Sequence, residues 1–241
     1  MLHNITYDTY PMVIHCPGKL NPDSWQSLLD IFFQRAKRNF GPVKDATIIT
    51  WNNGEKGLFE RSLDHIGVPY IVLGKNVKNW KNPIKIELTN RALHDIKTKF
   101  VIGIDSHDAI ICKDPNEIIS TFTFSFPKVK MLFNCGPVHH PPVNRSFFKF
   151  QERIGLGHDF RHLNSGAWAG ETEFCKMFFE SCINSRQFDE NPMNGWWDLS
   201  DQMYIKSTFP QYHPKVQLDY TSEIFQILPN INVIAMKKMF L

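Results

Sequence analysis

Two carboxylates close a short apolar run in the middle of the sequence. Residues 99–104 read Lys-Phe-Val-Ile-Gly-Ile, and Asp105 and Asp108 follow with a serine and a histidine between them. Such a run is typical of a strand covered on both faces of a sheet, and ligands of open α/β sheets bind beyond the carboxyl ends of strands. Hard oxygen ligands at close spacing suit Mg²⁺ or Mn²⁺ carrying a nucleotide diphosphate. The alternative is a polar turn after a core strand, because Asp and Ser are common turn residues.

The composition is that of a globular protein. The 241 residues are 42% hydrophobic and 21% charged, and this length is enough for one sizeable α/β domain. A net charge of +3 gives no basis for nucleic-acid binding. The sequence has no apolar run as long as a membrane span and no signal-peptide core near its start. Five cysteines without a Cys-x-x-Cys pair argue against a zinc site or disulfide framework, so we expect free thiols and a cytoplasmic protein.

Strand and helix patterns alternate through the first half of the chain. The strand-like runs are Ala46–Trp51, 70–73 and Phe100–Ile104, and the helical patterns between them are Leu58–Ile66 and 84–96. This alternation predicts a parallel sheet with right-handed crossovers. The sequence lacks the Gly-x-Gly-x-x-Gly and P-loop patterns, which excludes those two kinds of nucleotide site.

The remaining patterns predict further elements of one domain, since no repeat or linker interrupts the chain. We expect a strand at 11–15 and a helix from Pro22 that is capped by Asn21 and ends at Gly41. A further helix is expected from Pro115, after the capping Asp114, to about 124. A loop is expected over 134–144 and a helix over 172–185.

Several separate segments, in this order, resemble one family. They are residues 104–111 with Pro115 and Glu117, then Leu163-Asn164-Ser165-Gly166, Asp201-Gln202, and Leu218-Asp219-Tyr220 with Ile224-Phe225-Gln226. Together they resemble the glycosyltransferase domain of the procollagen lysyl hydroxylases, a collagen glucosyltransferase family. The resemblance implies an α/β, GT-A-like fold: a mixed, mainly parallel sheet flanked by helices, with a Rossmann-like nucleotide-binding half. It also implies metal-dependent transfer of a hexose from a UDP-sugar, with retention of configuration.

One departure from the family suggests a circular permutation. The family's C-terminal strand supplies a metal-binding histidine in a His-x-x-Gly turn followed by a lysine, and the end of this sequence lacks that motif. Residues 7–19 resemble it instead and include His15. We therefore hypothesise a single domain over 1–241, in which 1–40 correspond to the family's C-terminal strand and helix and 45–228 form the main region. The alternative for His15 is a strand-end histidine with a local partner.

The resemblance implies the ligands of the donor. Asp105, Asp108 and His15 would hold the metal, and Mn²⁺ is favoured over Mg²⁺ because it accepts an imidazole more readily. Gly18 and Lys19 would neutralise the diphosphate, unless Lys19 is a solvated surface residue. The remaining nucleotide contacts are expected from Thr50, Trp51, Asn52, Trp80, Lys85, Ser106 and His107.

A second group of residues is assigned to the sugar and the acceptor. Asn164 and Ser165 are expected to form a polar turn that binds donor hydroxyls. Asp201, with Asp198 before it, would orient an acceptor hydroxyl or stabilise positive charge at the anomeric carbon. Asp201 is alternatively a helix-start carboxylate.

The tryptophan pair, the loop 139–142, the acceptor and the function itself are further assignments. Trp196 and Trp197 are either a sugar-stacking platform or a packed core pair, and the loop 139–142 is interpreted as a mobile lid. The acceptor is a glycan, a protein side chain or a small molecule. A non-catalytic nucleotide-sugar-binding domain and a sugar nucleotidyltransferase are the alternative functions, although the second normally opens with a Gly-rich turn that this sequence lacks.

Overall fold

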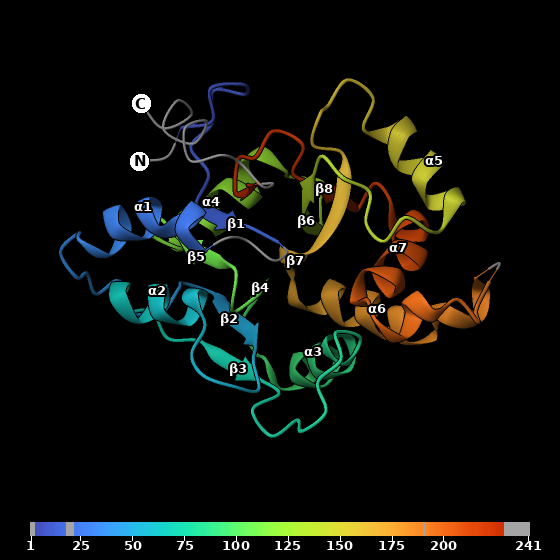
Figure 1. The fold of residues 1–241 in the computed structure, drawn as a ribbon, viewed down its shortest axis with the longest axis horizontal. Coiled ribbons are helices and arrows are strands. Elements are labelled where there is room, and N and C mark those ends of the chain that lie inside the picture. The colour runs from blue at the N-terminus through green and yellow to red at the C-terminus, as the bar shows by residue number, and fades with distance from the viewer. Residues whose placement is uncertain (1–2, 18–21, 190, 229–241) are drawn as a thin grey trace.

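A six-stranded mixed sheet forms the centre of the computed structural model, which describes residues 3–17, 22–189 and 191–228 (Figure 1). The strand order is β3-β2-β4-β7-β6-β8. The pairs β3–β2, β2–β4 and β6–β8 are parallel, whereas β7 runs antiparallel to both β4 and β6. The strands are β2 (Ala46–Trp51), β3 (Ile71–Leu73), β4 (Phe100–Ile104), β6 (Met131–Gly136), β7 (His162–Glu171) and β8 (Val216–Leu218).

Helices cover both faces of this sheet. On one face α3, α6 and α7 pack against one another, and on the other face α2 packs against β5 of the second sheet (Figure 1). In the described parts of the chain, no helix is long and apolar enough to cross a membrane. The helices are α1 (Pro22–Phe33), α2 (Leu58–Ile66), α3 (Ile84–Asp95), α4 (Asn116–Ser125), α5 (Arg145–Ile154), α6 (Thr172–Asn184) and α7 (Asp201–Tyr212), with short 3-10 helices η1 (Ser185–Phe188) and η2 (Gly195–Asp198).

Strand β4 is apolar throughout because helices cover it on both sides. Phe100, Ile102 and Ile104 belong to the core that also contains the buried face of α2. Val101, which points the other way, belongs to the core that contains α3 and α6. Each side chain of β4 therefore leaves water whichever way it points, which explains the uninterrupted apolar run and stabilises the strand at the centre of the sheet.

A smaller sheet brings the start of the chain to the end of β4. It consists of β5 (Ala109–Ile111), β1 (Val13–His15) and β9 (Phe225–Ile227), in that order. β1 is the middle strand, antiparallel to β5 and parallel to β9, and its residues are fully or almost fully buried. The strand expected near the start of the sequence is therefore part of the core.

Two expected boundaries are wrong. The helix expected to continue to Gly41 ends at Phe33. From Arg38 onward the backbone takes long-range partners that a helix could not keep; Phe40 N donates to Ile66 O at 3.0 Å. The cap proposed at Asn21 lies outside the described residues. The loop expected over 134–144 begins later, since β6 continues to Gly136.

The polar turn expected at Asn164 and Ser165 is also wrong. Both residues lie in β7, where the pairing register with β6 shifts between Phe133 and Asn134. Residues 165–167 of β7 lie between the partners of these two neighbouring residues of β6. Irregularities in a strand pair change the direction of side chains next to functional sites. A polar Asn-Ser-Gly sequence is typical of a turn from local propensity. Here Asn164 pairs with Asn134 of β6, and Gly166 O accepts a hydrogen bond from Asp105 N. Ser165 N donates to Gln202 of α7, so contacts with distant segments keep the sequence extended.

Candidate functional site

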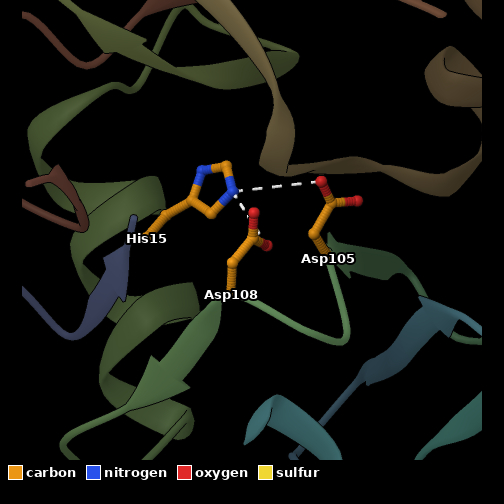
Figure 2. A group of neighbouring side chains, drawn as sticks. All are labelled: His15, Asp105 and Asp108. Atoms are coloured by element: carbon orange, nitrogen blue, oxygen red, sulfur yellow. Dashed lines mark ion pairs between the residues drawn. The ribbon is translucent and has the colours of Figure 1, made fainter. Parts of the chain in front are cut away.

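His15, Asp105 and Asp108 converge at the edge of the central sheet (Figure 2). Nε2 of His15 lies 3.3 Å from Oδ1 of Asp108 and 3.9 Å from Oδ2 of Asp105. One ligand atom from each side chain falls within 4.8 Å of the others. The histidine is 1% exposed, whereas the two carboxylates are partly open to solvent. The three side chains therefore form a polar cluster with a buried side and an accessible side.

Backbone pairing fixes this convergence. His15 is paired opposite Ala109, so it lies beside the residue that precedes β5, and Cys16 N donates to Asp108 O at 2.8 Å. Asp105 N donates to Gly166 O at 2.8 Å, which ties the end of β4 to β7.

Gly166 leaves the room that the cluster occupies. A Cβ atom on Gly166 would lie 2.2 Å from Cε1 of His15 and 2.8 Å from Oδ2 of Asp105. Only glycine therefore lets the backbone of β7 approach both side chains this closely.

The charges of the cluster depend on one another. Burial would lower the pKa of His15, but the carboxylates of Asp108 and Asp105 raise it above its usual value. Burial would raise the pKa of Asp108, but the neighbouring His15 lowers it. Burial keeps the pKa of Asp105 raised although Lys85 Nζ lies 2.7 Å from Oδ1. The pKa of each group in this cluster of two acids, one imidazole and one ammonium thus depends on the charges of the others.

The donor set fits a divalent cation. Nε2 of His15 is buried and has no hydrogen-bond partner among the described residues, because its contacts with the two carboxylates lack hydrogen-bond geometry. Two carboxylate oxygens and one imidazole nitrogen suit Mn²⁺ or Mg²⁺. An octahedral ion about 2.1 Å from its ligands places neighbouring donor atoms about 3 Å apart and opposite ones about 4 Å apart. The two distances from Nε2 of His15, 3.3 Å to Asp108 and 3.9 Å to Asp105, lie in that range.

Two cavities meet at this cluster, and both are lined by Asn82, Lys85, Asp105 and Asp108. The smaller has a volume of about 240 Å³ and the larger about 520 Å³. The smaller cavity is also lined by Trp51, Asn52, Asn53, Trp80, Ser106 and His107. The larger is also lined by His15, Pro17, Gly136, Pro137, Val138, His140, His162, Leu163, Asn164, Ser165, Gly166, Ser200, Asp201, Gln202 and Ile227.

A buried glutamate supports the smaller cavity. Oε1 of Glu60 accepts hydrogen bonds from Asn52 Nδ2 and, at 2.7 Å, from Ser106 Oγ, so one carboxylate holds the turns after β2 and β4 together. Burial would raise the pKa of Glu60, but these two hydrogen bonds lower it. The sequence marks Glu60 by its position three residues after Gly57, as in a capping box at the start of a helix. Oε1 of Glu60 also accepts a hydrogen bond from Gly57 N at 3.3 Å.

The first turn of α7 supports the larger cavity. Asp201 is 6% exposed, and its Oδ2 lies 3.9 Å from Lys85 Nζ. Gln202 accepts from Ser165 N at 2.9 Å and donates to His140 O at 2.8 Å, so it links β7 to the loop that faces it. Lys206 donates to the same carbonyl. The loop 139–142, interpreted as a lid, is thus anchored through His140; its mobility stays a prediction.

The structure brings together most of the residues predicted to bind the nucleotide. Trp51, Asn52, Trp80, Lys85, Ser106 and His107 line the smaller cavity. Thr50 does not, because it is buried and its hydroxyl donates to Ile104 O at 2.6 Å inside the sheet. Gly18 and Lys19 lie outside the described residues.

Of the residues predicted for the sugar and acceptor, some line the larger cavity and one does not. Asn164, Ser165 and Asp201 line the larger cavity. Asp198 does not; it is exposed, forms an ion pair with Arg186 at 2.8 Å and lines a separate cavity of about 340 Å³.

The tryptophan pair is not a stacking platform. Trp197 is fully buried and donates to Asp189 at 2.8 Å, whereas Trp196 is half-buried and packs edge-on against His140. Of the two alternatives, the stacking platform of two rings is therefore wrong. Trp197 is a core residue, whereas Trp196 contacts His140, which lines the larger cavity.

Asn82 and Gln202 were not predicted as site residues. Asn82 precedes α3 in a polar segment with no distinctive pattern, and Gln202 follows Asp201 as a single amide with no pattern of its own. Single amides carry too little signal to be found without their neighbours in space.

One comparison with known proteins identifies a family. The family described as the PLOD GT domain matches residues 44–238. No curated protein matches the sequence.

Proposed function

The chain belongs to the PLOD GT domain family, and from this premise we propose that it is a metal-dependent glycosyltransferase. It would transfer a hexose from a UDP-sugar to an acceptor, with retention of anomeric configuration. The observation that carries this proposal is the position of His15, Asp105 and Asp108 at the junction of two cavities. A leaving diphosphate between a nucleoside pocket and an acceptor pocket needs positive charge at this junction.

The metal would be held by Asp105, Asp108 and His15. When bound, a divalent ion supplies Lewis-acid stabilisation of the charge that develops on the leaving diphosphate. Mn²⁺ is the preferred candidate, because an imidazole is among the ligands. Lys85 lines both cavities and would add a second positive charge beside the diphosphate.

The smaller cavity suits the nucleoside. Trp51, Trp80 and His107 provide ring surfaces against which a pyrimidine can pack, and Asn52 provides hydrogen-bonding groups. Because Glu60 holds the turns that carry Asn52 and Ser106, this pocket is formed before the donor arrives.

The larger cavity suits the donor sugar and the acceptor. Asn164 and Ser165 offer polar groups for sugar hydroxyls. Asp201 would orient the acceptor hydroxyl or stabilise positive charge at the anomeric carbon. The acceptor class stays open among a glycan, a protein side chain and a small molecule.

The circular permutation also belongs to this proposal. Strand β1 lies between β5 and β9, and this pairing puts His15 against Asp108. The family matches residues 44–238, so His15 comes from outside the matched range. Both observations support a histidine supplied by the opposite end of the chain from that in the family.

A binding domain without turnover is the second candidate. It is favoured by Asp198, whose carboxylate pairs with Arg186 outside the cavity and leaves Asp201 as the acid on the acceptor side. The two functions are separated by incubating the protein with UDP-hexoses and Mn²⁺ and measuring released UDP. A transferase releases UDP in the presence of Mn²⁺ and stops on chelation, with GDP- and CMP-sugars as controls. A binding domain leaves every donor intact.

A further inference from the structure

We propose that Asn134 is a positioning residue for His15: its amide oxygen accepts the N–H of Nδ1 and thereby leaves Nε2 bare for a metal ion. This inference rests on the proposed function, because it concerns the metal-loaded state of His15. It adds a residue of β6, a strand that contributes none of the three proposed ligands.

Asn134 lies against the side of the imidazole that faces away from the carboxylates. Its side chain is fully buried, and its Nδ2 lies 3.3 Å from Nδ1 of His15. Oδ1 of Asn134 and Nε2 of His15 are both buried and have no hydrogen-bond partner among the described residues. Two unpaired polar atoms thus occur in one pair of contacting side chains. Buried polar atoms are costly to leave unpaired, so this pair requires an explanation.

The chemistry of the imidazole explains why these two atoms have no partner. A neutral histidine has one N–H, and it binds a metal through the nitrogen that lacks the hydrogen. Nε2 of His15 is the nitrogen that faces Asp105 and Asp108. For Nε2 to bind the ion, the hydrogen must be on Nδ1, and the neighbour of Nδ1 must then be an acceptor.

The amide of Asn134 meets this requirement by flipping, which exchanges the positions of Oδ1 and Nδ2. Its oxygen and nitrogen have nearly the same size, so either can occupy the position beside Nδ1. With Nδ2 beside Nδ1, the ring carries its hydrogen on Nε2, which faces Asp108 and blocks a metal ion. With Oδ1 beside Nδ1, the hydrogen is held on Nδ1 and Nε2 is free. Outer partners of this kind orient a ligand and typically contribute 10–100-fold to metal affinity.

Two substitutions of similar size test the acceptor. Asn134→Leu removes the acceptor while keeping the volume, and Asn134→Asp keeps acceptor oxygens while removing the N–H donors. Mn²⁺ binding is measured by titration of the free ion, without nucleotide, after circular dichroism and urea unfolding establish that each variant is folded. We expect at least tenfold weaker binding in Asn134→Leu and binding within about threefold of wild type in Asn134→Asp.

A spectroscopic measurement separates positioning from packing. In the protein loaded with diamagnetic Zn²⁺, the ¹⁵N-histidine spectrum should report a hydrogen on Nδ1 of His15, shifted downfield by its hydrogen bond, in wild type and Asn134→Asp. The same resonance should move upfield in Asn134→Leu.

Three outcomes overturn the inference. Equal Mn²⁺ affinity in wild type and Asn134→Leu, or equal losses in the leucine and aspartate variants, overturns the role of Asn134 alone. Failure of the wild-type protein to bind Mn²⁺ overturns the metal site of the proposed function as well.

Discussion

Oδ1 of Asp108 lies 3.3 Å from Nε2 of His15 because the strands that carry them are neighbours, with His15 paired opposite Ala109. The contact joins the start of the chain to the acidic turn after β4. A helix or loop insertion between these segments would not change it, because backbone pairing of β1 with β5 sets the distance. The candidate metal centre is therefore a property of the small sheet as much as of the central one.

We expect Gly166→Ala to weaken metal binding. The new Cβ would lie 2.2 Å from Cε1 of His15 and would displace that ring or Asp105. Mn²⁺ affinity should fall at least tenfold, and the free energy of unfolding should drop by about 1–3 kcal/mol, the usual cost of overpacking. Gly195→Ala is the matched control, because nothing lies within 4 Å of its Cβ position. Unchanged Mn²⁺ affinity in Gly166→Ala would show that the close approach of β7 does not matter to the site.

We expect chelation to leave the protein folded. The strands that carry the cluster are held by backbone pairing and by an apolar core rather than by the ion. Saturation with Mn²⁺ at one hundred times Kd should add about 2.7 kcal/mol to the free energy of unfolding, and chelation should remove that amount alone. Thermal unfolding with and without chelator measures it. Loss of the far-UV circular dichroism spectrum on chelation at 25 °C would contradict this account.

We expect the buried Lys206 to make the free energy of unfolding depend on pH. Burial lowers the pKa of its ammonium from 10.5 to about 7, and the nearby imidazoles of His139, His140 and His162 provide no negative charge. Between pH 7 and 10.5 the unfolded chain binds this proton and the folded protein does not, so the contribution to stability rises with pH across that window. This contribution to stability is lost as the pH falls to about 7.

The variant Lys206→Met removes this titration. Urea unfolding at pH 7 and pH 9 should reveal a gain of about 2–3 kcal/mol in the wild-type protein that is missing from the variant. The control is Lys97→Met, because Lys97 also donates to a carbonyl, that of His94, but is exposed. If the free energy of unfolding changes equally with pH in wild type and in Lys206→Met, the lowered pKa of Lys206 is refuted.

Asp201→Asn should separate transfer from donor binding. The carboxylate lines the larger cavity, 3.9 Å from Lys85 Nζ. Under the proposed function, its loss would remove charge at the reacting carbon rather than at the nucleotide. We expect transfer to fall at least a hundredfold, while UDP affinity in the presence of Mn²⁺ stays within about threefold. An equal fall in UDP affinity would instead make Asp201 a donor-binding residue.

Local patterns in the sequence predict those elements that local forces determine. The bounds of β2 and α2 were predicted to the residue, since helical periodicity and burial on both faces leave direct traces in the order of side chains. Asp105 and Asp108 could be assigned to a ligand site because they follow a buried strand. The role of His15 came from the resemblance to a family, since nothing in its own segment points to the acids.

What could not be predicted depends on contacts between distant segments. Helix α1 does not reach Gly41, because residues 38–41 donate backbone hydrogen bonds to the end of α2 and to Gly67. The burial of Trp197 and the exposure of Asp198 follow from one short 3-10 helix, in which neighbouring side chains point about 120° apart. The contact of Asn134 with His15 exists because β1 and β6 meet the same site from different sheets.

The most direct measurement is calorimetric titration of UDP into the wild-type protein and Asp108→Ala, each with and without Mn²⁺. Asp64→Ala, which removes an exposed aspartate on α2, serves as the control. We expect Mn²⁺ to strengthen UDP binding in wild type and in the control, and Asp108→Ala to lose this enhancement while remaining folded. The same UDP affinity in Asp108→Ala and wild type, with Mn²⁺ present, would contradict a metal centre built from His15, Asp105 and Asp108.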